Sequence, residues 1–81
     1  MSDPNLISKL SEILSSLLGD DSILLTAETT RQDIPEWDSF QYINFIVAVE
    51  MEYNIKFRVS DVESFRNVGE IATEILSLRS Q

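Results

Sequence analysis

The sequence predicts an all-α fold, a small four-helix bundle with three main helices, one short helix and a long loop between the first and second. Two observations predict it. Apolar residues recur at helical spacings of three and four along three segments, and residues typical of helix ends flank these segments. Because amphipathic helices must bury their apolar faces against one another, we expect a bundle. The 81 residues form a single domain, 1–81, with a small core.

The first helix is expected over residues 5–18, where the apolar positions follow a helical stripe: Leu6, Ile7, Leu10, Ile13, Leu14, Leu17 and Leu18. Pro4 suits the first turn of this helix, and Gly19 suits the residue after its last turn. The residues at both ends of the segment therefore support the same helix limits as the apolar pattern.

A long loop is expected from Gly19 to Trp37, with Thr29 and Thr30 starting a short turn. Four apolar residues are expected to anchor this loop over the core: Ile23, Leu24, Leu25 and Ile34. Loops of this length are uncommon in compact domains, and they are usually functional or packed by their own side chains.

The second helix is expected over residues 39–53 and carries more than one apolar face. Asp38 is a preferred N-cap residue, and Gln41 follows it three residues later as in a capping box. One stripe contains Phe45, Val49 and Tyr53, and a neighbouring stripe contains Phe40, Ile43 and Val47. Either the helix is central in the bundle, or one stripe faces a partner or an apolar cargo.

The last third of the chain predicts a connector and two further helices. Residues 55–59 alternate like a strand, but a lone strand has no pairing partner, so they are interpreted as a connector. Ser60–Glu63 fits a capping box that opens a short helix, and Asn67–Glu70 fits one that opens the last helix, which runs to about Leu78. The apolar face of that helix contains Val68, Ile71, Ala72, Ile75 and Leu76. Residues 77–81 are expected to fray.

Composition argues against several classes of function. The 14 acidic and 6 basic residues give a net charge of −8, which disfavours nucleic acid and anionic membranes and favours electropositive proteins. Because the chain has no His and no Cys, neither an enzyme nor a metal site is expected. The sequence has no stretch of 18 apolar residues, no basic region before an apolar core and no small-residue cleavage site, so neither a membrane span nor a leader segment is expected. We expect a free-standing cytoplasmic monomer without membrane insertion.

The most informative motif is Trp37–Phe40, in which Asp38 and Ser39 open the longest apolar helical run. Unpaired N–H groups and the positive end of the helix dipole stabilise an anion at a helix N-terminus. A serine in the first turn is therefore a good place to attach a phosphodiester. The competing interpretation is that the Asp-Ser pair only caps the helix.

These features resemble the acyl carrier protein family, small acidic helical proteins that carry acyl groups on a 4′-phosphopantetheine arm. Asp38–Phe40 resembles the family's Asp-Ser-Leu attachment motif, and residues 50–57 and 67–71 resemble its downstream helix end and its last helix start. The resemblance covers nearly the whole chain. It implies that an Mg²⁺-dependent phosphopantetheinyl transferase attaches the arm from coenzyme A to Ser39, and that the thiol of the arm performs the acyl chemistry.

The resemblance also implies roles for other residues. Asp38 matches the acid associated with the transferase and with helix capping, so it is grouped with Ser39 in the cofactor site. Ile43 and Val47 match exposed apolar positions near the arm, and Phe40 is grouped with them as partner-binding. Three acids match positions that meet basic partner patches: Glu50, Asp61 and Glu63. The partners implied are the transferase and acyl-activating, acyl-transferring or condensing enzymes.

Departures from the family pattern favour a dedicated pathway. Phe40 replaces the usual Leu, and Gln41 and Asn44 stand where housekeeping fatty-acid carriers usually have acids. Trp37 is seen in specialised and in peptidyl carriers, or it simply packs on the loop. The expected function is an acyl carrier of a dedicated lipid, secondary-metabolite or surface-polysaccharide pathway. The alternatives are an aminoacyl or peptidyl carrier and a cofactor-free helical interaction module.

Overall fold

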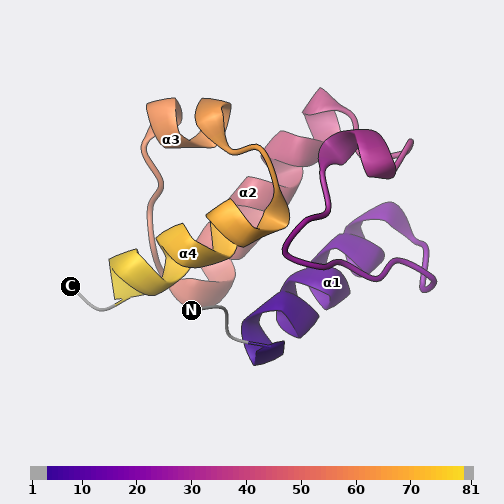
Figure 1. The fold of residues 1–81 in the computed structure, drawn as a ribbon, viewed down its shortest axis with the longest axis horizontal. Coiled ribbons are helices and arrows are strands. Elements are labelled where there is room, and N and C mark those ends of the chain that lie inside the picture. The colour runs from indigo at the N-terminus through magenta and orange to yellow at the C-terminus, as the bar shows by residue number, and fades with distance from the viewer. Residues whose placement is uncertain (1–3, 80–81) are drawn as a thin grey trace.

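The computed structural model describes residues 4–79 and has an all-α architecture (Figure 1). Within that range it contains four α-helices and one short 3-10 turn, η1: α1 (Pro4–Leu18), η1 (Arg31–Asp33), α2 (Ser39–Tyr53), α3 (Val59–Ser64) and α4 (Val68–Arg79). The predicted fold class and the three long helices are confirmed. No helix in this part of the chain is both long and apolar enough to cross a membrane.

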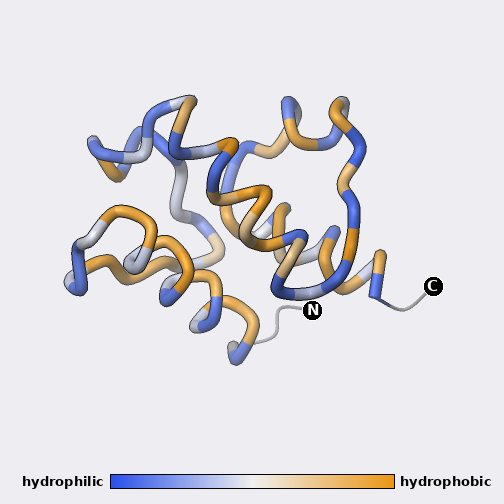
Figure 2. Tube along the Cα trace, turned by 180° about the vertical axis from the view of Figure 1, so that it is seen from behind, coloured by the Kyte–Doolittle hydropathy of each residue, from blue (hydrophilic) through white to orange (hydrophobic). Residues whose placement is uncertain are grey.

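The core lies where α1 packs against α2 and α4. The largest fully buried side chains come from these three helices: Leu10, Leu14, Phe45, Val49, Val68, Ile71 and Ile75. Figure 2 shows hydrophobic and hydrophilic positions alternating along the helical turns, as expected for segments with one buried face. The short helix α3 lies on the other side of the molecule from α1, beside α2 and α4 (Figure 1).

The boundaries of α1 and α2 follow the predicted signals. Gly19 has φ 69°, the left-handed conformation expected of the residue after a helix. The carboxylate of Asp38 accepts the backbone N–H of Gln41 at 2.9 Å, so Asp38 is the N-cap of α2. The reciprocal half of the predicted capping box is absent among the described contacts, because the Gln41 side-chain oxygen instead accepts from Asn44 at 3.3 Å. Asp38 is therefore the side chain that caps the N-terminus of α2.

The N-terminus of α4 is hydrogen-bonded to the long loop between α1 and α2. Asn67 caps it by accepting the Glu70 N–H at 2.9 Å, as the sequence predicts. The backbone N–H of Gly69 donates to the Ala27 carbonyl at 2.8 Å, and a Cβ at position 69 would lie 2.9 Å from that oxygen. A side chain at Gly69 would thus push the loop away, so the glycine permits the loop to approach α4.

The prediction that Leu24 anchors the loop over the core is wrong, because its side chain is 82% exposed. Leu24 lies in a segment without helix or strand, where neighbouring side chains differ in burial. Leu25 is buried instead, and its N–H donates to the hydroxyl of Ser11 at 3.0 Å. The predicted anchors Ile23 and Ile34 are partly buried against the core.

The predicted start of the short helix is also wrong, because α3 begins at Val59 with Arg58 as its N-cap, not with a capping box at Ser60. A tertiary contact places the turn. The N–H of Phe57 donates to the Glu50 carboxylate at 2.8 Å, and its ring packs edge-on against Phe65 at 5.6 Å. Anchoring on both sides of α3 therefore outweighs the local capping signal.

The predicted fraying of residues 77–81 is wrong for residues 77–79, which are helical, and residues 80–81 lie outside the described range. Two contacts hold the last turn. Leu78 packs against the core, and the Arg79 guanidinium lies 5.2 Å from the centre of the Tyr53 ring. The end of α4 is thus fixed to the end of α2.

Candidate functional site

Ser39 is the first residue of α2, and its side chain is exposed. Its hydroxyl has no hydrogen-bond partner in the part of the chain that the structure describes. The preceding Asp38 uses a carboxylate oxygen to cap the helix, so it holds the turn that presents Ser39. The competing sequence interpretation, a cap, is confirmed for Asp38, and the cap leaves the neighbouring hydroxyl accessible.

This setting fits a phosphodiester at Ser39. The helix behind it has fifteen residues, and its first N–H groups lack partners within the helix. Negative charge is stabilised there by the helix dipole. A basic side chain, Arg31, lines the same pocket as Ser39. Three features therefore favour an anionic group on the Ser39 hydroxyl: the hydroxyl is exposed, the dipole of α2 is positive at this end, and a cationic side chain lies nearby.

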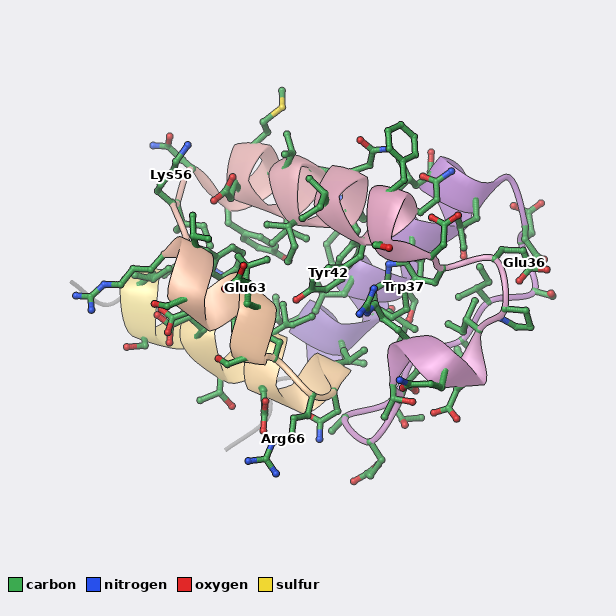
Figure 3. All side chains as sticks on the ribbon, turned by 90° about the horizontal axis from the view of Figure 1, so that it is seen from above. Glu36, Trp37, Tyr42, Lys56, Glu63 and Arg66 are labelled. Carbon is green, nitrogen blue, oxygen red and sulfur yellow. The ribbon has the colours of Figure 1, made fainter. Side chains whose placement is uncertain are left out.

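A pocket of about 250 Å³, which we call the serine pocket, lies beside Ser39 between α2 and α3. Its lining residues come from η1, α2 and α3 and from the segment after α3: Arg31, Ser39, Tyr42, Ile43, Val62, Glu63 and Phe65. The structure therefore brings together three residues that the sequence singled out, Ser39, Ile43 and Glu63. Figure 3 shows Glu63 on α3 and Tyr42 inside the bundle.

Tyr42 forms the inner side of the serine pocket. Its hydroxyl donates to the carbonyl of Val62, which ties α2 to α3. The guanidinium of Arg31 lies 4.6 Å from the centre of the Tyr42 ring. Burial raises the pKa of the Tyr42 phenol, and the nearby positive charge of Arg31 partly opposes that rise. The phenol is therefore neutral near pH 7 and remains a hydrogen-bond donor.

The second apolar stripe of α2 faces solvent. Phe40, Ile43 and Val47 are 73%, 51% and 47% exposed, and Met51 extends the same row at 78%. On the opposite side, Phe45 is fully buried. Of the two alternatives left open by the sequence, the structure supports an apolar stripe that is not used by the core. We call these four residues the exposed stripe.

The three predicted partner-binding acids have different surroundings. Glu50 is half-buried and accepts the Phe57 N–H, so its carboxylate stabilises the fold, which the sequence did not indicate. Asp61 is half-buried in the first turn of α3, and Glu63 is exposed. Only Glu63 lies at the serine pocket, while Glu50, Asp61 and Val47 lie outside it.

Trp37 packs in the core rather than on the loop alone. It is 3% exposed, and its ring centre lies 5.2 Å from that of Phe45 and 6.1 Å from that of Tyr42. Its indole Nε1 is buried and has no hydrogen-bond partner among the described residues. No pattern in the sequence indicates this unpaired donor.

Arg31 and Tyr42 are site residues that sequence reasoning missed. Tyr42 falls three residues after Ser39 on the buried side of α2, which was a usable signal. No signal in the sequence pointed to Arg31, because its contact with the Tyr42 ring depends on how the long loop folds back over α2. Both residues line the serine pocket.

Comparison with known proteins agrees with this geometry. The family model for a phosphopantetheine attachment site matches residues 8–75. The solution NMR structure of the holo acyl carrier protein from Geobacter metallireducens is similar over the whole fold, with a TM-score of 0.86. The two sequences are 37% identical, and the match covers 96% of this chain and 88% of that chain.

Proposed function

Because this chain belongs to the family of acyl carrier proteins with a phosphopantetheine attachment site, we propose that Ser39 carries the arm and presents acyl groups to enzymes of a dedicated pathway. Members of this family are carriers and not catalysts. When attached, the arm supplies the thiol that holds acyl groups as thioesters, so the chain needs no nucleophile of its own. Membership removes the cofactor-free interaction module from the alternatives.

One observation carries the assignment to Ser39: its hydroxyl is exposed at the capped N-terminus of α2, beside a pocket. The phosphopantetheinyl transferase would join the Ser39 oxygen to the pantetheine-bearing phosphorus of coenzyme A. The pyrophosphate bond of coenzyme A breaks in this step, adenosine 3′,5′-bisphosphate leaves, and the hydroxyl proton is released. Asp38 positions the turn, and the N-terminus of α2 stabilises the phosphate charge. Arg31, the basic residue of the serine pocket, adds to this stabilisation.

The exposed stripe and Glu63 form the proposed partner surface. Exposed apolar residues in a row are typical of protein-binding faces, and an acid beside them adds attraction to basic patches. The partners proposed are the transferase and acyl-activating, acyl-transferring or condensing enzymes. Glu50 and Asp61 contribute less, because both are half-buried.

A dedicated pathway is proposed because the front of α2 lacks acids. Gln41 and Asn44 are uncharged, and the Asn44 side-chain amide donates to the Gln41 side-chain oxygen at 3.3 Å, so these two positions carry no negative charge. Basic partner patches that recognise acids there would lose complementarity. The similarity to a holo acyl carrier protein supports an acyl cargo over the aminoacyl alternative.

The experiment is intact mass spectrometry after incubation with coenzyme A, Mg²⁺ and a broad-specificity phosphopantetheinyl transferase. The wild type should gain one phosphopantetheine mass, and Ser39→Ala should gain none. Ser60→Ala is the matched control, because Ser60 is also an exposed serine in the first turn of a helix, and this variant should be modified like the wild type. An unmodified wild type, or a modified Ser39→Ala, would contradict the proposal.

A further inference from the structure

A second pocket lies next to the serine pocket and reaches further into the bundle, and we call it the inner pocket. It has a volume of about 230 Å³ and lies between η1, α2 and the start of α4. Besides Tyr42, its walls include three residues of the core: Trp37, Val68 and Ile71. The serine pocket has no core residue other than Tyr42 in its lining. The inner pocket therefore lies between the serine pocket and the core.

The boundary between the two pockets is formed by the residues that line both of them: Arg31, Tyr42 and Phe65. Of these three, Tyr42 is the buried one, with 8% of its surface exposed, and its ring points from α2 toward α3 (Figure 3). Its hydroxyl donates to the Val62 carbonyl, and the Arg31 guanidinium covers the ring at 4.6 Å. The Trp37 ring lies 6.1 Å away, centre to centre. Contacts on several sides thus hold Tyr42 in the boundary.

Passage from the serine pocket into the inner pocket would require Tyr42 to move. The hydrogen bond between its hydroxyl and the Val62 carbonyl is partly buried, and Val62 packs against the core. Breaking this bond would leave two polar groups inside the bundle without partners, which is unfavourable. An alkyl chain has no donor or acceptor, so it cannot replace the bond that it would displace. The Tyr42 ring would also expose apolar surface if it swung outward.

We propose that Tyr42 closes the way from Ser39 to the core, so that acyl groups on the arm stay outside the bundle whatever their length. Long and short groups are then equally open to partner enzymes, and selection by length is left to those enzymes. A smaller side chain at position 42 would join the two pockets, and a long alkyl chain would then gain by burial. The inference rests on the proposed function, because the acyl group arrives on the arm at Ser39.

The experiment compares acetyl and octanoyl groups held as thioesters on the arm. The transferase loads each from the corresponding acyl-coenzyme A, and intact mass verifies loading. Hydroxylamine attacks the thioester carbonyl, so the rate of acyl loss measures how open the group is to solvent. Each rate is divided by the rate for the same acyl group on free pantetheine, which removes the intrinsic difference between the two thioesters. The wild type should give the same ratio for acetyl and octanoyl.

Variants of two tyrosines on α2 test whether Tyr42 closes the way. In Tyr42→Ala the octanoyl ratio should fall about tenfold below the acetyl ratio, because the longer chain can now be buried. Tyr42→Phe, which removes only the hydrogen bond to Val62, should lower it about twofold to threefold. Tyr53→Ala is the matched control, since Tyr53 lies about 21 Å along α2 from Ser39 and outside both pockets, and its two ratios should stay equal.

Circular dichroism shows whether each variant is folded, and if Tyr42→Ala is not, Tyr42→Phe decides. The inference is overturned if octanoyl is already protected relative to acetyl in the wild type. It is also overturned if the folded Tyr42 variants keep equal ratios, or if Tyr53→Ala protects octanoyl as strongly as they do. Failure of the wild type to load either group would appear in the intact mass, and it would contradict the proposed function and this inference with it.

Discussion

The two faces of α2 have the same kind of sequence and opposite environments. Phe45 and Val49 are four residues apart and fully buried, whereas Val47 and Met51 are also four residues apart and are 47% and 78% exposed. Periodicity therefore marks an apolar face without saying whether the core covers it. What separates the faces is the rest of the fold, because α1 packs on one side of α2 only.

The packing around the two faces explains why they should behave independently. The buried face touches aromatic neighbours, with the Trp37 ring edge-on to Phe45 at 5.2 Å. The exposed stripe has no aromatic contact among the described residues and lines the serine pocket only through Ile43. Substitutions on the buried face should change stability, and those on the exposed stripe should change partner binding.

The largest difference between the two faces is expected when one phenylalanine on each face is replaced by alanine. Phe45→Ala should lower the free energy of unfolding by about 3–5 kcal/mol, because it removes a fully buried ring and leaves a cavity. Phe40→Ala, the matched control, should change it by no more than about 0.5 kcal/mol. Urea unfolding followed by circular dichroism measures both. Should Phe45→Ala not fold, Phe45→Leu gives the comparison at a smaller cost, and equal losses on the two faces would contradict the account.

A smaller loss of stability is expected when the cap at the N-terminus of α2 is removed. Asp38→Ala should lower the free energy of unfolding by about 1 kcal/mol, because the Gln41 N–H loses its acceptor. Asp61→Ala is the control, since its carboxylate has no hydrogen bond in the described part of the chain, and its change should stay within about 0.5 kcal/mol. If the two variants are equally stable, Asp38 does not hold this turn.

The smallest effect is expected on turnover by a partner enzyme when charge is added at positions 41 and 44 of α2. A Gln41→Asp, Asn44→Glu double variant of the holo protein should be a several-fold better substrate for a fatty-acid malonyl transferase at low salt, because each exposed charge pair contributes about 0.2–1 kcal/mol. High salt should remove the gain by screening. Ser8→Asp, Ser16→Glu adds the same charge at exposed positions on α1 and should give no gain. Equal turnover of all three proteins at low salt would mean that these positions do not set partner choice.

Local patterns predicted the elements of the fold well, because the signals of α1, α2 and α4 lie within each helix. Predictions failed where distant residues decide. The start of α3 depends on the contact between Phe57 and Glu50. The exposure of Leu24 depends on its neighbour Leu25, whose N–H donates to Ser11. The contact between Arg31 and the Tyr42 ring could not be predicted for the same reason, since it forms only when the long loop folds back over α2.

Within the candidate site, the sequence placed Ser39 correctly at the start of a helix because the Asp-Ser capping signal is local. Spacing alone also divided the apolar residues of α2 into two stripes, but it left open whether one of them faces solvent, and it did not place Met51 in either. The sequence did not indicate that Trp37 is buried with an unpaired Nε1, because burial of one ring depends on the packing of Tyr42 and Phe45 around it.

Locating the modification within the chain tests whether Ser39 is the residue that carries the arm. Holo protein made with the transferase and coenzyme A is digested, and the phosphopantetheinylated peptide is sequenced by tandem mass spectrometry. We expect the arm on Ser39 alone, within the peptide that contains Trp37 and Phe40. An arm found on any other serine, or a holo preparation in which the Ser39 peptide is unmodified, would contradict it.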